Sequence, residues 1–232
     1  MENREKSDEI IKKKKLRNEL IIHSIIIVIL FIICGWDRKI NIPKFPKNFL
    51  FLTQICLYIN LIYYFISIFF NIKYQISMNK SSKILLLFNF NFCVSFVVFI
   101  MFWSLLFFDK ANLYGKEKRI EVPTLLNMLL HGGVFTSNLI ELFFIIKNEK
   151  EIYINNFFFF FFTIFYLTIL YIIKIAFDIK VYPFIYGNFV KFLLISMASF
   201  IICLIGHYIY KFIAKQKVDR KDKNNYEEFE LS

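Results

Sequence analysis

Six long apolar stretches run through this sequence, and they restrict its possible folds more than any other feature. Of its 232 residues, 58% are hydrophobic. The stretches cover residues 20–36, 48–72, 84–108, 124–146, 154–177 and 189–213. Each is near or above the length of about 20 residues that a helix needs to cross a ~30 Å hydrocarbon core. Because lipid gives backbone groups no water to bond, we expect an all-α, polytopic membrane protein with a bundle of six transmembrane helices.

The longest polar segments lie at the two ends of the chain. We therefore divide it into a basic arm (1–19), a six-helix transmembrane domain (20–213) and a charged tail (214–232). The first apolar stretch is too long for a signal peptide, and the Cys34–Gly35–Trp36–Asp37 segment is no small-residue cleavage site. We expect this stretch to remain as a helix.

Lysine and arginine residues indicate the orientation of the bundle. With both termini in the cytoplasm, the cytoplasmic segments carry 18 of these residues and the opposite loops carry 9. This bias favours cytoplasmic termini. It also places the sequon Asn79–Lys80–Ser81 in a cytoplasmic loop, where it should stay unmodified. The membrane is that of the endoplasmic reticulum or the plasma membrane, and both alternatives stay open.

Charge and cysteine content exclude several function classes. The net charge of +11 reflects topology and attraction to anionic lipid, and no soluble basic domain is present to bind nucleic acid. The four cysteines all lie within apolar stretches, and no pair has the spacing of a metal site. We therefore expect them to be small packing residues, and we expect neither a metal nor a cofactor. They are Cys34, Cys56, Cys93 and Cys203.

Two polar residues lie at matched depth in the apolar stretches. Thr53 lies five residues into the second stretch, about 7.5 Å deep, and His131 lies seven residues into the fourth, about 10 Å deep. Both stretches begin on the non-cytoplasmic side in the expected topology. Ionisable groups at membrane depth are costly, so His131 indicates a functional site.

Other polar residues fall on or near the same helix face. Asn127 and Asn138 lie one turn before and two turns after His131, and Glu141 lies deeper, about 80° around the helix. The remaining histidines, His23 and His207, fall near the cytoplasmic ends of their stretches, where we expect interfacial roles.

Threonine and histidine at one depth are typical of a nucleophile and its base. A hydroxyl is a weak nucleophile until a neighbouring base accepts its proton, and neutral imidazole suits that task. The alternative is structural, because a threonine in a membrane helix often bonds its own backbone and a buried histidine often bridges helices. The spacing alone leaves both interpretations open.

Several short motifs follow one another in order along residues 36–190. They are Phe51–Leu52–Thr53, Phe102–Trp103, Asp109, Pro123, Leu126–Asn127, His131, Glu141 and Val181–Tyr182–Pro183. This ordered set resembles the androgen-induced protein family, which also has six spans. The resemblance implies a membrane threonine hydrolase that cleaves fatty acid esters of hydroxy fatty acids. The nucleophilic threonine and the histidine of the family align with Thr53 and His131.

The sequence departs from the family pattern at three places near the expected site. Met128 replaces the first histidine of the family's LNHxxH motif, whereas the second is kept as His131. Gln54 follows Thr53 where family members often have an aromatic residue, and Gly132–Gly133 follows the histidine. These departures bear on substrate preference more than on the chemistry.

The resemblance implies acyl transfer to Thr53 and then to water, with His131 moving the protons. Asn127 and Asn138 are candidate donors to the oxyanion, or else they form structural inter-helix bonds. Asp37 and Asp109 lie at the outer ends of their helices and either orient His131 or remain solvated. The lipid ester would enter from the bilayer. Two other functions stay open, a small transporter with His131 in a polar pathway and a non-catalytic membrane regulator.

Overall fold

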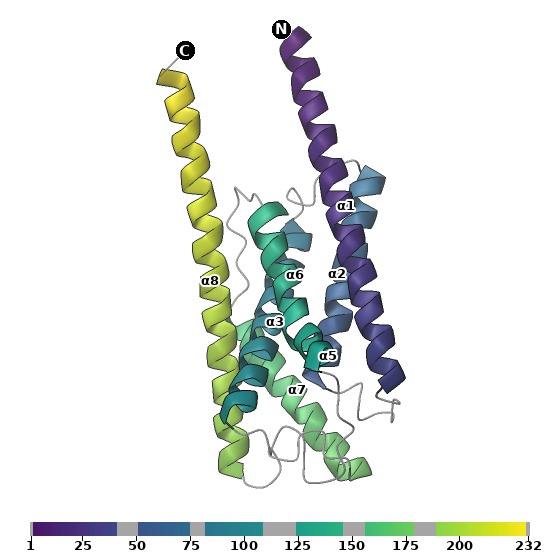
Figure 1. Cartoon of the computed structure of the whole chain (residues 1–232). Helices are drawn as coiled ribbons and strands as arrows, with labels where there is room; N and C mark the ends of the chain where they lie inside the picture. Colours follow the sequence, from purple (N-terminus) through teal and green to yellow (C-terminus); the bar gives the residue numbers. More distant parts are fainter. Residues whose placement is uncertain are drawn as a thin grey trace.

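The computed structural model describes residues 2–40, 51–74, 82–108, 124–145, 156–178 and 189–230 (Figure 1). Within these residues every regular element is a helix. The α-helices are α1 (Glu2–Ile40), α2 (Leu52–Tyr74), α3 (Ser82–Phe108), α5 (Thr124–Met128), α6 (Val134–Ile140), α7 (Asn156–Phe177) and α8 (Phe189–Glu230). Two π-helical segments, η3 (Leu129–Gly133) and η4 (Glu141–Ile145), alternate with α5 and α6. The predicted all-α fold is therefore confirmed.

Five of the helices are long and apolar enough to cross a membrane, which makes the chain a multi-pass integral membrane protein. The remaining apolar stretch is the fourth along the chain, and it consists of α5, η3, α6 and η4. Met128, Gly133, Val134 and Glu141, at the junctions, all keep right-handed helical dihedral angles. Residues 124–145 therefore form one continuous helix with two wider turns, which we call the fourth helix.

Each wide turn of the fourth helix coincides with an ionisable residue. His131 lies in η3 and Glu141 lies in η4. Gly132 and Gly133 complete η3, and glycine weakens regular α-helix by about 1 kcal/mol per residue relative to alanine. Isolated π-turns inside α-helices are rare and frequently mark functional sites.

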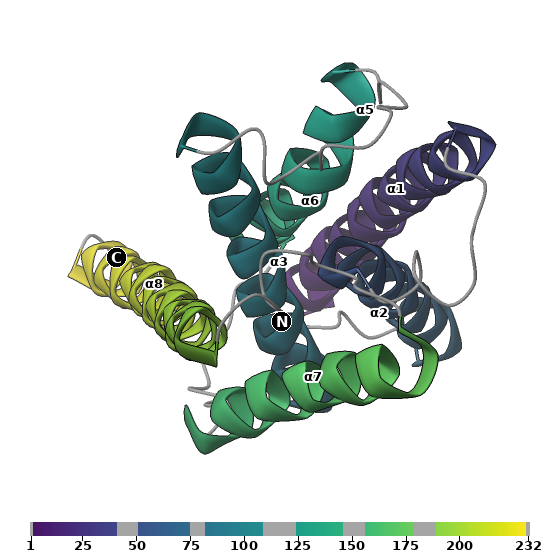
Figure 2. The same cartoon turned by 90° about the horizontal axis from the view of Figure 1, so that it is seen from below.

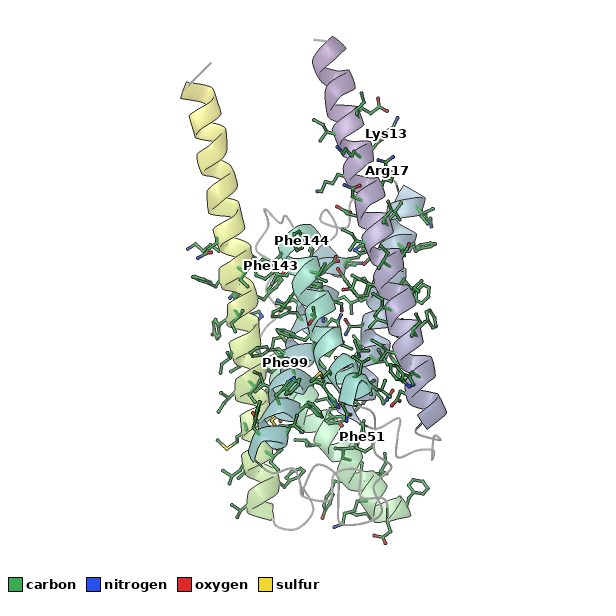
Figure 3. All side chains as sticks on the ribbon, viewed as in Figure 1. Lys13, Arg17, Phe51, Phe99, Phe143 and Phe144 are labelled. Carbon is green, nitrogen blue, oxygen red and sulfur yellow. The ribbon has the colours of Figure 1, made fainter. Side chains whose placement is uncertain are left out.

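The helices α1 and α8 continue beyond the apolar stretches into the polar ends of the chain. The two termini lie at the same end of the molecule, and α1 carries Lys13 and Arg17 there (Figures 1 and 3). Phe51, at the start of α2, lies at the opposite end (Figure 3). Leu52 and Thr53, which follow Phe51, are therefore far from the basic arm. They lie in the half of the bundle where α5 begins.

The centre of the bundle is formed by α1, α2, α3 and the fourth helix, while α8 packs on α3 and α7 packs on α8. Seen from the end away from the termini, α7 crosses below α2 and α3 (Figure 2). At the contact of α3 and α8, a Cβ added to Gly206 would lie 2.9 Å from Phe96 Cδ1, so the small residue permits the close approach.

The buried face of α2 is unusually polar for a membrane helix. Its members recur at helical spacing and are fully buried, and they are Cys56, Asn60, Tyr63, Ser67 and Asn71. Because lipid cannot satisfy such groups, this face must turn toward other helices. It orients α2 so that Thr53, one turn before Cys56, also faces the bundle.

Candidate active site

Thr53 and His131 meet at the end of the bundle away from the termini. Thr53 Oγ1 lies 3.3 Å from His131 Nδ1. When the ring carries its proton on Nε2, the hydroxyl donates to Nδ1, which is the arrangement that a base needs to accept the hydroxyl proton. Both side chains are half-buried. The structure thus brings together the two residues that matched depth and the family resemblance both indicated, and their catalytic roles stay a prediction.

Thr53 lies closer to the end of its helix than the sequence led us to expect. The helix begins at Leu52 rather than at residue 48, so Thr53 is in the first turn. The backbone N–H groups of Gln54 and Ile55 both donate to Phe51 O, at 2.9 and 3.1 Å. The N–H of Thr53 precedes them, at a position where an α-helix offers no intrahelical acceptor.

Residues on both sides of Thr53 fix it against other helices. Phe51 packs against Leu167 and Leu170 of α7. On the other side, Gln54 Nε2 donates to Asp37 Oδ2 of α1 at 2.5 Å. The start of α2 is therefore held from two directions, which limits the movement of Thr53.

The ring of His131 lies flat against Phe102 of α3. The two ring centroids are 3.5 Å apart and the planes differ by 7°. Phe102 itself is buried, with 7% of its surface exposed. One face of the imidazole is therefore covered, while the edge that carries Nδ1 points at Thr53.

The predicted supporting residues separate into different groups. Asp37 bonds Gln54, so the structure gives the expected orienting carboxylate a different partner from His131. Asn127 is half-buried one turn before His131. Asp109 lies outside the described residues, as does the sequon at Asn79.

Asn138 was expected to share the face of His131, and the structure corrects this. Its amide nitrogen donates to Ser95 Oγ at 2.6 Å, and its oxygen accepts from Asn91 Nδ2 at 3.2 Å. Asn91 and Asn60 also exchange two hydrogen bonds, at 2.7 and 2.9 Å. These bonds agree with the structural inter-helix role that was the alternative, and the oxyanion role of Asn138 stays a prediction.

This amide cluster connects α2, α3 and the fourth helix. Cys56 joins it through a contact of 3.3 Å between its Sγ and Ser95 Oγ. Sequence reasoning assigned Cys56 to packing only and did not single out Asn60, Asn91 or Ser95. Polar residues three or four apart within apolar stretches were the signal that could have identified them.

A comparison with protein families covers most of the chain. The family model for FAR-17a/AIG1-like protein matches residues 18–216. The chain belongs to this family. The resemblance to the androgen-induced protein family is thereby confirmed. Neither the curated proteins nor the solved structures gave a match.

A second buried cluster lies in the half of this FAR-17a/AIG1-like protein that is nearer the termini. His23 Nε2 of α1 lies 3.1 and 3.0 Å from the two carboxylate oxygens of Glu141. Tyr63 donates its hydroxyl proton to Glu141 Oε1 at 2.9 Å. His23 and Glu141 have no exposed surface.

The expectation of interfacial roles for the other two histidines is therefore wrong. His23 is buried against Glu141, and His207 Nδ1 lies 3.2 Å from Asn89 Oδ1 between α8 and α3. The sequence showed how far along each helix these residues lie. It did not show which face of α1 or α8 meets another helix.

The described residues contain no cluster of three or more His, Cys, Asp or Glu side chains that could hold a metal ion. The structure also defines a groove of about 540 Å³ along α7, lined by Phe158, Phe161, Phe162, Ile164, Phe165 and Thr168. This apolar groove does not include Thr53 or His131. The chemistry available at the candidate site is thus that of a hydroxyl, an imidazole and backbone N–H groups.

Proposed function

We propose that this protein is a membrane hydrolase that cleaves lipid esters such as fatty acid esters of hydroxy fatty acids. The observation that supports this proposal best is the 3.3 Å contact between Thr53 Oγ1 and His131 Nδ1. A threonine that only bonds its own helix would not require this pairing. Family membership agrees with the proposal and leaves the substrate to be established.

The reaction proceeds in two halves. Thr53 Oγ1 attacks the ester carbonyl carbon while its proton moves to His131 Nδ1. The tetrahedral intermediate then breaks the bond to the hydroxy fatty acid, whose oxygen takes the proton from Nδ1. In the second half, water attacks the acyl-threonine and gives a proton to Nδ1. Release of the fatty acid returns that proton to Thr53 Oγ1.

The oxyanion of each tetrahedral intermediate needs donors that are already in place. The Thr53 N–H lies in the first turn of α2, beside its own Oγ1, at the end where the helix dipole favours negative charge. Asn127 would supply a second donor from one turn before His131. Asn138 bonds Ser95 and Asn91, so we expect a structural role for it instead.

The site should open to the non-cytoplasmic leaflet. Both termini lie at one end of the bundle, together with Lys13 and Arg17, and the excess of basic residues places that end in the cytoplasm (Figure 3). Thr53 and His131 lie toward the other end. A lipid ester would then approach sideways from the opposite leaflet and present its carbonyl close to the membrane surface.

The test is hydrolysis of a panel of lipid esters by the purified protein in detergent or lipid vesicles. We expect turnover of the hydroxy fatty acid esters and covalent labelling of Thr53 by a fluorophosphonate probe. Thr53→Ala should abolish both. The matched control is Thr136→Ala, because Thr136 lies on the fourth helix, is exposed and bonds only the Gly132 carbonyl, at 2.9 Å. A folded wild type that neither turns over nor becomes labelled would favour a non-catalytic regulator.

A further inference from the structure

The stack of Phe102 on His131 is the tightest ring contact at the candidate site. The ring centroids lie 3.5 Å apart with an interplanar angle of 7°. Phe102 comes from α3, whereas His131 and Thr53 come from the fourth helix and α2. The three helices thus meet at one imidazole ring, with the phenyl group on its face and the hydroxyl at its edge.

The imidazole ring needs such a constraint, because the second side-chain torsion of histidine is broad. In many hydrolases a carboxylate bonds the far ring nitrogen and so fixes the ring. Here the described residues give His131 two contacts, the bond to Thr53 and the stack on Phe102. The carboxylate of Asp37, which could have served, bonds Gln54 instead.

We propose that Phe102 is a positioning residue that holds the plane of the His131 ring so that Nδ1 faces Thr53 Oγ1. The inference rests on the proposed hydrolase function. Phe102 donates and accepts no proton, and it acts only through His131. A flat phenyl surface keeps the imidazole from tilting out of this plane, while the bond to Thr53 selects the Nδ1 edge. The ring thus stays in place while Nδ1 gains and loses a proton in each half of the reaction.

Replacement of Phe102 by leucine removes the flat surface and keeps an apolar side chain. We expect Phe102→Leu to lower kcat and the rate of fluorophosphonate labelling by about 10–100-fold, since misplacement of a catalytic group by about 1 Å can cost that much. KM should change little, because Phe102 does not bind the ester. Phe102→Tyr should restore most of the rate, since it restores the flat ring, which a merely structural role would not require.

The matched control is Phe99→Leu. Phe99 lies one turn earlier on α3 and stacks on Phe135, with centroids 5.0 Å apart and planes at 30°. The two substitutions remove the same ring from the same helix, but only one of these rings covers His131. Phe99→Leu should therefore leave kcat close to that of the wild type.

A double substitution gives the sharpest test. If Phe102 acts through His131, then Phe102→Leu should have almost no effect in a His131→Ala background. An equal loss in both backgrounds would overturn the inference, as would a wild-type labelling rate in folded Phe102→Leu. If the Phe102→Leu variant aggregates, Phe102→Met takes its place, and the same results are expected to support or overturn the inference. Failure of the wild type to become labelled would instead overturn the proposed function.

Discussion

His131 and Glu141 lie ten residues apart on the fourth helix, each in a π-turn, and their surroundings are opposite. His131 is half-buried and meets a hydroxyl, while Glu141 is completely buried and bonds His23 and Tyr63. Both pairs contain an imidazole and an oxygen at about 3 Å. Only the first keeps part of its surface exposed.

We therefore expect burial to separate the proposed reactive pair from a structural one in this bundle. Glu141 is completely buried, and His23 and Tyr63 both bond its carboxylate. We expect such a group to fix helices rather than to bind a substrate. Thr53 and His131 bond each other at 3.3 Å, and both side chains are only half-buried.

The largest expected effect is at the half-buried pair. His131→Ala should lower kcat by about 10²–10⁴-fold, because it removes the general base, and thermal stability should change little. The measurement is steady-state hydrolysis of a lipid ester beside a thermal unfolding curve in detergent. Combining His131→Ala with Thr53→Ala should cost hardly more than either alone, since the nucleophile and base act as one unit. Additive losses would show that the two residues act separately.

The buried pair should respond in the opposite way. Glu141→Ala leaves His23 and Tyr63 buried without their partner and should lower the free energy of unfolding by about 3–5 kcal/mol. Replacing both partners by apolar residues, as in His23→Leu with Glu141→Met, should recover much of that loss. Denaturant unfolding measures both.

The specific activity of the folded Glu141→Ala fraction decides whether the comparison holds. It should fall far less than in His131→Ala. A stable Glu141→Ala protein without turnover would place the buried pair in the reaction and remove the distinction between the two regions.

A smaller effect is expected between the two regions, at the amide cluster. Asn138→Ala removes one partner of Ser95 and one of Asn91 and should cost about 1–3 kcal/mol of stability. Its kcat should stay near that of the wild type. A fall of about 10²–10³-fold in kcat with stability unchanged would instead restore Asn138 as an oxyanion donor.

The smallest expected effect is at Asn79, where we expect no modification. Expression in a eukaryotic cell should leave Asn79 free of glycan, because the loop that contains it is expected in the cytoplasm. A glycosidase shift on a gel measures this. The Asn79→Gln variant gives the unmodified mobility for comparison. Glycan on Asn79 would turn the bundle over and move the half-buried pair to the cytoplasmic leaflet.

The six helices and the meeting of Thr53 with His131 could be predicted because they depend on position along the chain. Apolar length identifies a membrane helix, and the rise of ~1.5 Å per residue gives the depth of each residue. The expected start of α2, near residue 48, was too early. The apolar run in the sequence begins before the first residue of the helix, which is Leu52.

The partners of Asn138, His23 and Glu141 could not be predicted because they depend on rotation about the helix axes. A straight α-helical projection placed Asn138 on the face of His131, but the wider turn of η3 lies between them. His23 was assigned to the interface from its depth, although α1 turns it toward the fourth helix. Rotational position follows from packing against other helices, which a single sequence does not show.

The uninterrupted course of α1 gives the N-terminal arm a mechanical link to the site. From Glu2 to Ile40 the helix is about 58 Å long. Near its far end Asp37 bonds Gln54, the residue next to the proposed nucleophile. A tilt of about 10° around the middle of such a rod displaces each end by about 5 Å. A tilt of the basic arm would thus be transmitted to Gln54, beside Thr53, over some 50 Å of helix.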